Sequence, residues 1–184
     1  MFRRPMRPMR PFRRAMMQPN QIVLQAIERA NQLMANGKPN DAAQIFERLA
    51  QEAEQRGLQK PAANAHAQAA HAYTLAKNEK AAITQARAAL TKFLQLGMAQ
   101  RATNFFNNAI QTAHANGWTT SADALQKEFG DQVKALGAQN AIAPQGRLPS
   151  KCPHCAAPAR SDEVDWIDAT SAECNFCGGV IQTE

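Results

Sequence analysis

The chain has 184 residues and a formal net charge of +6, and aromatic residues make up only 6% of it. This length fits one domain with a small appendage, and the scarcity of aromatic and β-branched residues argues against a large sheet. There is no run of about 18 apolar residues, which excludes a membrane-spanning helix. The basic N-terminus is not followed by an apolar stretch, so we expect no secretory signal and a cytoplasmic location.

Residues 1–19 form a basic tail that accounts for the whole excess of positive charge. An Arg-Pro-apolar triplet occurs three times between residues 4 and 12. Proline at every third position matches the turn length of polyproline II, in which arginines would follow one edge and apolar residues another. We expect this disordered tail to bind a partner through Arg4, Arg7, Arg10, Met6, Met9 and Phe12. The partner is an acidic protein groove, nucleic-acid phosphates or an anionic membrane surface; the alternative is a tail that only increases solubility.

Residues 20–137 contain a helix-ending residue every twenty positions. These are Gly37, Gly57, Lys77-Asn78, Gly97, Gly117 and Gly137. Glycine is common just after a helix because the chain there adopts a left-handed conformation. The apolar residues between these positions follow helical spacing, which predicts six helices of about 15–18 residues. Ala42, Ala82 and Ala122 lie forty residues apart, so the repeating unit is a pair of helices and the prediction is three stacked helix hairpins.

The stretch GKPNDAAQIF, from Gly37 to Phe46, resembles the turn and second helix of the tetratricopeptide repeat, although that family repeats about every 34 residues. The resemblance implies an α-solenoid with a concave face that binds a protein or peptide. Polar residues of the first helix of each pair would line this face, namely Asn31, Gln32, Asn64, Gln68, Asn104, Asn107 and Asn108. A solvated face on a plain six-helix bundle is the alternative. His66, His71 and His114 are expected in surface or capping roles, since His66 and His71 do not share a helix face.

Residues 138–150 contain two prolines and a glycine and no helical periodicity, which predicts a linker before a module of residues 151–184. The four cysteines of the chain lie in this module as two Cys-x-x-Cys pairs, Cys152, Cys155, Cys174 and Cys177. Two such pairs supply the four thiolates that tetrahedral zinc prefers, so we expect one structural zinc ion with no open coordination position. The motif resembles a zinc ribbon, and iron in a rubredoxin-like site is the alternative. His154 lies inside the first pair and is interpreted as a neighbour of the metal.

Short strands are expected between and after the cysteine pairs. Trp166 is either an exposed contact residue for a partner or a side chain packed over the ribbon. Six acidic residues outnumber two basic ones from residue 151 onward, and four metal-bound thiolates would add to this negative charge. Such a surface disfavours phosphates and favours a basic protein partner, one candidate being the chain's own tail.

The sequence therefore predicts a mainly α protein, with three stacked helix hairpins and a small zinc-ribbon module of short strands. It contains no nucleophile–base arrangement, no phosphate-binding glycine loop and no recognisable pair of catalytic carboxylates, which argues against an enzyme. The hypothesis is a non-enzymatic adaptor or assembly scaffold that binds a protein or peptide. The alternative is a protein associated with RNA, DNA or the ribosome through its basic tail.

Overall fold

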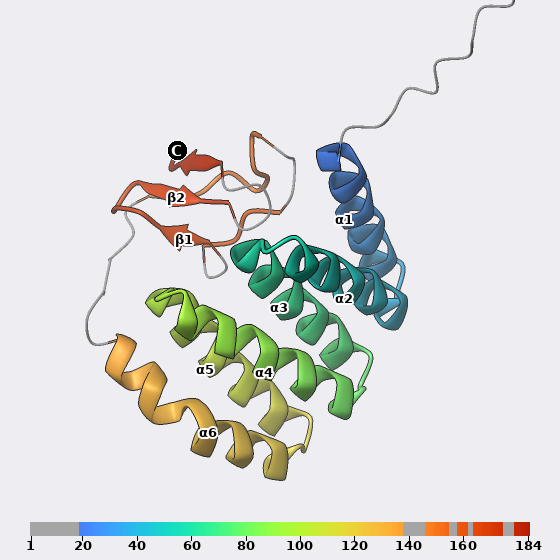
Figure 1. Ribbon diagram of the computed structural model, residues 1–184, viewed down its shortest axis with the longest axis vertical. Coiled ribbons are helices and arrows are strands. Elements are labelled where there is room, and N and C mark those ends of the chain that lie inside the picture. Colours follow the sequence, from blue (N-terminus) through green and yellow to red (C-terminus); the bar gives the residue numbers. More distant parts are fainter. Residues whose placement is uncertain (1–18, 138–145, 155–157, 162–163, 175–178) are drawn as a thin grey trace, which may run out of the picture.

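A computed structural model of the chain describes residues 19–137, 146–154, 158–161, 164–174 and 179–184 (Figure 1). Six helices come first, followed by three short strands. The helices are α1 (Pro19–Ala35), α2 (Pro39–Gln55), α3 (Gln59–Leu75), α4 (Glu79–Gln95), α5 (Ala99–Ala115) and α6 (Thr119–Gly137). The strands are β1 (Asp165–Trp166), β2 (Ser171–Glu173) and β3 (Val180–Gln182). The predictions of a mainly α protein with six helices and a few short strands are confirmed. Among the described residues, no helix has the length and apolar character needed to cross a membrane.

The five turns between helices share one local structure. In the first, the N–H of Lys38 donates to the carbonyl of Leu33 and the N–H of Gly37 donates to that of Met34, which is the Schellman arrangement. It requires a left-handed residue after the helix end, and Gly37 has φ +70°. The same pair of hydrogen bonds closes each later turn. At the third turn the left-handed residue is Lys77, with φ +58°, as its place in the series predicts. α1 begins one residue before Asn20.

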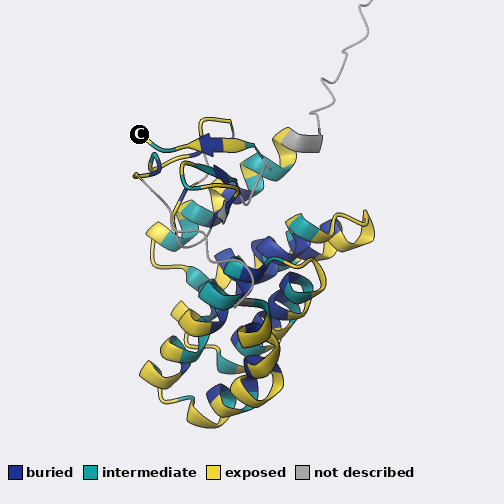
Figure 2. Ribbon diagram, turned by 90° about the vertical axis from the view of Figure 1, so that its left-hand side faces the viewer, coloured by how far each residue is buried: buried dark blue, intermediate teal, exposed yellow. Residues whose placement is uncertain are grey.

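The helices pack in successive pairs, with α3 between α2 and α4 (Figure 1). Small side chains make this close packing possible: Ala62, Ala63, Ala67, Ala69, Ala70 and Ala72 of α3 are all buried. Larger side chains fill the space between the later helices, where Leu90, Phe106, Leu125, Phe129 and Val133 form one apolar cluster. Figure 2 shows buried residues along the facing sides of the helices and exposed residues at the turns.

The strands form an antiparallel sheet in the order β1-β2-β3. Trp166 pairs with Ala172, and Ala172 pairs with Ile181, so these three residues cross the sheet in one row. All three are buried. Leu148, which the sequence assigned to the linker, is buried in the same cluster, and the N–H of Glu184 donates to the carbonyl of Arg147. The chain therefore packs with the C-terminal module before residue 151.

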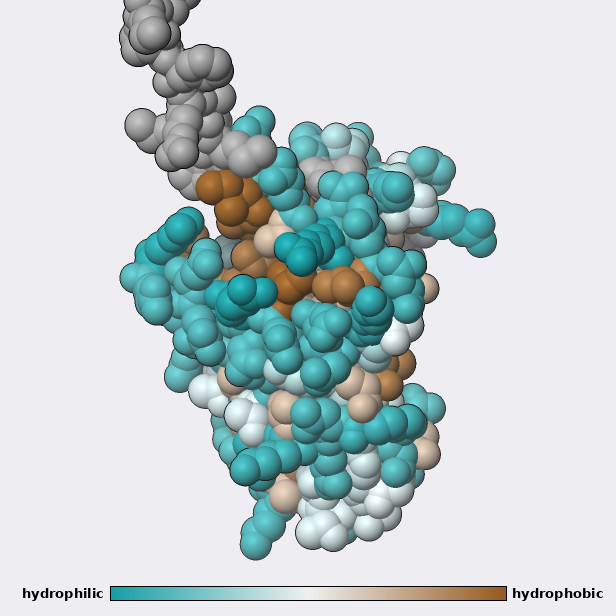
Figure 3. All heavy atoms as spheres, turned by 90° about the vertical axis from the view of Figure 1, so that its right-hand side faces the viewer, coloured by the Kyte–Doolittle hydropathy of each residue, from teal (hydrophilic) through white to brown (hydrophobic). Residues whose placement is uncertain are grey.

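Large apolar side chains remain exposed at several places on the described surface. Ile22 of α1 is 54% exposed, Leu58 beside the second turn is 49% exposed, and Val180 of β3 is 47% exposed. Figure 3 shows hydrophobic side chains gathered beside the start of α1, where the chain continues into residues 1–18. Nothing in the described residues covers this patch, and the tail residues predicted to bind a partner lie outside the described residues.

Candidate functional sites: the cysteine module, an interhelical pocket and a polar network

The cysteine module brings one cysteine of each Cys-x-x-Cys pair into the same apolar cluster. Cys152 is 2% exposed and Cys174 is 3% exposed, and both belong to the cluster built around the sheet. Cys155 and Cys177 lie outside the described residues. Within the described residues, no group of three or more His, Cys, Asp or Glu side chains could hold a metal ion by itself. The two described sulfurs are buried as structural metal ligands are.

Backbone hydrogen bonds shape the chain around both described cysteines. The N–H of His154 donates to Sγ of Cys152 over 3.4 Å, a contact that stabilises a thiolate more than a thiol. The N–H of Cys174 donates to the carbonyl of Gly179 over 2.9 Å, so the chain turns back after this cysteine. His154 places Nε2 3.1 Å from the carbonyl oxygen of Val180. Because a carbonyl only accepts, Nε2 donates to it. These residues fit a thiolate metal site, with His154 linking the chain beside Cys152 to β3.

Trp166 is 6% exposed and lies in the apolar cluster of the module. Its Nε1 donates a hydrogen bond to the carbonyl of Ser161 over 3.0 Å, which satisfies the polar end of the ring. The sequence left open whether Trp166 is an exposed contact residue or a packed side chain, and in the structure it is packed. The correction has a simple reason: on a three-stranded sheet of two- and three-residue strands, Trp166 is the largest apolar side chain available to cover the core.

The module contacts the helical part at the beginning of α3 and at α5. Nζ of Lys60 lies 2.6 Å from Oε2 of Glu173, and both side chains are about one-third exposed. Lys60 is in the first turn of α3, and Glu173 is the last residue of β2, directly before Cys174. β1 contacts α5. The sequence placed these two parts in separate domains, and the structure shows that they touch.

A pocket of about 50 Å³ lies between α3, α4 and α5. Its walls are mostly apolar and include five alanines, and four polar side chains also line it. The lining residues are Ala70, His71, Thr74, Ala82, Ile83, Ala86, Phe105, Asn108, Ala109, Thr112, Ala113 and Trp118. None of them is acidic. The pocket exists because Ala82 and Ala86 of α4, and Ala109 and Ala113 of α5, leave space beside the larger ring of Phe105.

Some residues of the predicted polar face are exposed in the structure and others are buried. Asn107 and Asn108 of α5 are exposed, and Asn108 lines the pocket. Asn64 of α3, in contrast, is buried with 5% of its surface exposed, so it cannot line an open face. The reason is that α2 and α4 both pack closely on α3, whereas α5 packs more closely on α6 than on α4.

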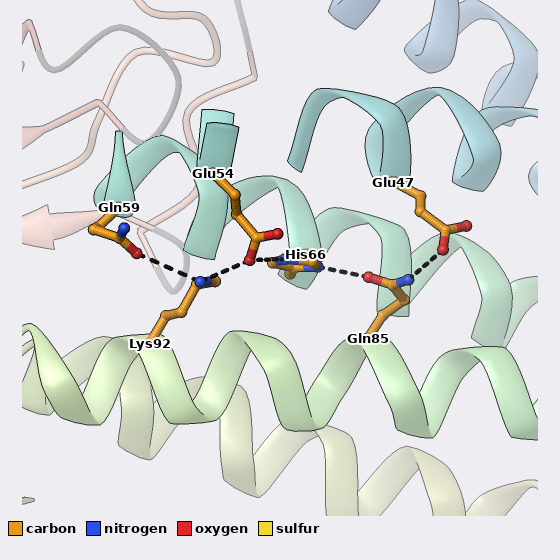
Figure 4. Close-up of polar contacts among 6 residues, drawn as sticks. All are labelled: Glu47, Glu54, Gln59, His66, Gln85 and Lys92. Carbon is orange, nitrogen blue, oxygen red and sulfur yellow. Dashed lines mark hydrogen bonds and ion pairs between the residues drawn. The ribbon is translucent and has the colours of Figure 1, made fainter. Parts of the chain in front are cut away.

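A polar network centred on a buried histidine connects α2, α3 and α4 (Figure 4). His66 of α3 is at its centre and is 7% exposed. Its Nδ1 lies 2.6 Å from Oε1 of Gln85 in α4, and its Nε2 lies 3.2 Å from Oε1 of Glu54 in α2. The prediction that His66 takes a surface or capping role was therefore wrong. Spacing within α3 could not reveal this burial, because α2 and α4 create it.

Two cross-links between α2 and α4 lie on either side of His66. Nε2 of Gln85 donates to Oε1 of Glu47 over 2.8 Å, and Nζ of Lys92 lies 2.7 Å from Oε1 of Glu54. Glu47 and Glu54 are seven residues apart in α2, and Gln85 and Lys92 are seven residues apart in α4. Seven residues are about two helical turns. One helix thus presents two carboxylates, and the other presents an amide and an ammonium group at matching heights. The seven-residue spacing is visible in the sequence, but it is equally consistent with polar residues on a solvated helix face.

The network shifts the pKa of two of its members. Hydrogen bonds from Lys92 and then from His66 hold the pKa of Glu54 below its ordinary value of 4.5, against an opposing effect of burial. Burial, and then the contact with Glu47, raises the pKa of Tyr73 to about 12. The Tyr73 hydroxyl donates to Oε2 of Glu47 over 2.7 Å. Near neutral pH the tyrosine is therefore protonated and Glu54 is an anion.

Comparisons with protein-family models, with curated proteins and with solved structures found no match to this chain.

Proposed function

We propose that this chain is a non-enzymatic adaptor that binds an acidic protein segment through its helical pairs and carries a structural zinc ion in its C-terminal module. The observation that supports binding is the pocket between α3, α4 and α5. A tetratricopeptide-like arrangement of the pairs, and a cytoplasmic location for a thiolate metal site, belong to the same proposal.

The charge around the pocket selects the partner. α3 and α5 contain no aspartate or glutamate, whereas α2, α4 and α6 all contain acidic residues. A binding face without carboxylates favours a segment that supplies them, because no like charges oppose its approach.

The size of the pocket selects the anchor residue. A volume of about 50 Å³ is well below the roughly 150 Å³ of a cavity that accepts benzene, so the pocket suits a small aliphatic side chain. Asn108, which lines the pocket, can donate its side-chain N–H to the backbone beside that anchor. The proposed ligand is an acidic segment with one alanine-, valine- or isoleucine-sized residue at its centre.

Fluorescence-labelled acidic peptides that differ only at the central residue test this proposal. Ala109→Leu fills the pocket from α5 and should weaken binding by at least about tenfold. Ala115→Leu, at the exposed end of the same helix, is the matched control and should bind normally. Binding of phenylalanine peptides as tightly as valine peptides, or unchanged binding by Ala109→Leu, would contradict it. Strongly salt-dependent binding of RNA or DNA that is lost when residues 1–14 are removed would replace it with the nucleic-acid hypothesis.

The proposed metal site uses Cys152, Cys155, Cys174 and Cys177. Zinc bound by four thiolates would supply a cross-link that a module with such short strands needs for stability. The burial of Cys152 and Cys174 in one cluster supports this. Metal analysis of the reduced protein should find about one zinc ion per chain, and Cys152→Ser with Cys174→Ser should release it while the helical circular dichroism persists. A reduced protein that binds no zinc, or a complete loss of helical signal in the variant, would contradict the proposal.

A further inference from the structure

The donor and acceptor of each hydrogen bond in the polar network can be assigned in turn, starting from Glu47. This assignment determines the charge of His66. The Glu47 carboxylate only accepts, and it accepts from the Tyr73 hydroxyl and from Nε2 of Gln85. The Gln85 amide is therefore oriented with its nitrogen toward α2. Its oxygen, which also only accepts, then lies 2.6 Å from Nδ1 of His66. Nδ1 must carry a proton.

The second ring nitrogen also faces an acceptor. Nε2 of His66 lies 3.2 Å from Oε1 of Glu54, and Glu54 is anionic near neutral pH because its pKa is lowered. A neutral imidazole has one N–H and one lone pair, whereas an imidazolium has two N–H groups. Only the imidazolium satisfies both contacts. With it, the network has two carboxylates, Glu47 and Glu54, and two cations, His66 and Lys92.

We propose that His66 is a charge-dependent joint between the first two helix pairs: as an imidazolium it links α4 to α2 through α3, and its deprotonation opens the link to Glu54. The neutral ring keeps its proton on Nδ1, where the contact with Gln85 is shorter. The Nε2 lone pair then faces the Glu54 carboxylate and repels it. Glu54 remains an anion because Lys92 still holds it at 2.7 Å, so the network acquires one uncompensated negative charge.

The charged groups near His66 come from both helices that pack on α3. α2 contributes Glu47 and Glu54, α4 contributes Lys92, and α3 itself contributes the neutral Tyr73 hydroxyl. Among these residue types, histidine is the one whose ordinary charge change falls between about pH 5 and pH 8. The joint should therefore be closed at the acidic end of this range and open at the alkaline end.

The next helix pair shows that the repeat does not require polar residues here. Forty residues on from His66, Gln85 and Glu54 stand Phe106, Leu125 and Leu94. Phe106 and Leu125 belong to the apolar cluster of α4, α5 and α6, and Leu94 packs against it. The same positions thus form an apolar junction between the second and third pairs and a charged junction between the first and second. At these three positions, only the first junction has titratable side chains.

The protonation state of His66 can be measured directly by ¹⁵N NMR of the imidazole groups of the full chain. Near pH 6 both ring nitrogens of His66 should be protonated, and near pH 9 only Nδ1 should be. A neutral His66 ring near pH 6 would overturn the proposal. This measurement needs no variant and is independent of peptide binding and of zinc.

Urea unfolding of the full chain tests whether loss of the contact between His66 and Glu54 lowers the stability of the fold. Between about pH 6 and pH 9 the unfolding equilibrium constant of the wild type should rise about tenfold, which is the low end for one hydrogen bond to a charged group because the Glu54 side chain is 40% exposed. His66→Phe, which copies Phe106, should lose this dependence, and Glu54→Gln should reduce it. His114→Phe on α5 is the control and should keep it, because His114 is exposed. An unaltered pH dependence in His66→Phe would also overturn the proposal.

Discussion

Replacing Lys77 by glycine should stabilise the protein, although it removes a hydrogen bond. Lys77 has φ +58° at the position where four other turns have glycines with φ between +67° and +79°. A left-handed conformation costs a residue with a side chain about 1–2 kcal/mol. The Lys77 ammonium donates to the side-chain oxygen of Asn116, but this contact is exposed and therefore contributes little.

The net effect is a difference between three terms. Relief of the left-handed conformation gains about 1–2 kcal/mol, while glycine gives the unfolded chain more freedom, which costs about 0.4–1 kcal/mol. Loss of an exposed hydrogen bond costs up to about 0.5 kcal/mol. We therefore expect Lys77→Gly to stabilise the protein by about 0.5 kcal/mol, or to raise the Tm by about 1–2 °C for a chain of this size.

Two variants separate the backbone effect from the side-chain effect. Lys77→Ala keeps the left-handed strain and removes only the contact with Asn116, so it should be neutral or slightly destabilising. Gly97→Lys introduces the strain at an equivalent turn, where an added Cβ would have nothing within 4 Å, and should destabilise by about 1 kcal/mol. Urea unfolding monitored by circular dichroism gives all three values. If Lys77→Ala stabilised the protein as much as Lys77→Gly, the backbone explanation would be wrong.

Three further predictions concern packing and charge. Leu125→Ala should cost about 2–5 kcal/mol, because Leu125 is 0% exposed, whereas Leu96→Ala, at a site 40% exposed, should change stability by less than about 0.5 kcal/mol; calorimetry distinguishes them. Because the pKa of Glu54 is lowered in the folded state, its contribution is present above its ordinary pKa of 4.5 and is lost as the pH falls below it, so acid unfolding of Glu54→Gln should be shallower than that of the wild type. Lys60→Glu should separate the module from α3, which small-angle scattering would show as a larger radius, and Lys60→Glu with Glu173→Lys should restore the wild-type value; no change in the single variant would mean that this ion pair does not hold the module.

The helix boundaries were predictable because they depend on short stretches of chain. A left-handed residue must follow each Schellman turn, and glycine or a tolerated substitute such as Lys77 marks that position without reference to the rest of the fold. The spacing of the four cysteines is similarly local, so it predicts a metal site, with zinc as the expected ion, from two pairs of residues. Neither prediction depends on which helices become neighbours in the fold.

The burial of individual side chains was not predictable in the same way. His66 and Asn64 lie on a polar, Ala-rich segment that would suit a solvated face, and they are buried because α2 and α4 cover α3 from both sides. Trp166 had two equally reasonable environments, and the row that it forms with Ala172 and Ile181 across the sheet decided between them. In each case the deciding contact came from another element.

The sequence by itself determined where the helices end, the forty-residue repeat of helix pairs, and the excess of arginines in the tail, since all three are properties of adjacent or regularly spaced residues. Only the tertiary structure decided that Lys60 meets Glu173, 113 residues away, that a pocket opens between α3, α4 and α5, and that His66 lies between two acceptors. The physical reason is that burial, and the hydrogen bonds which burial makes obligatory, depend on elements that are distant in the chain and adjacent in space.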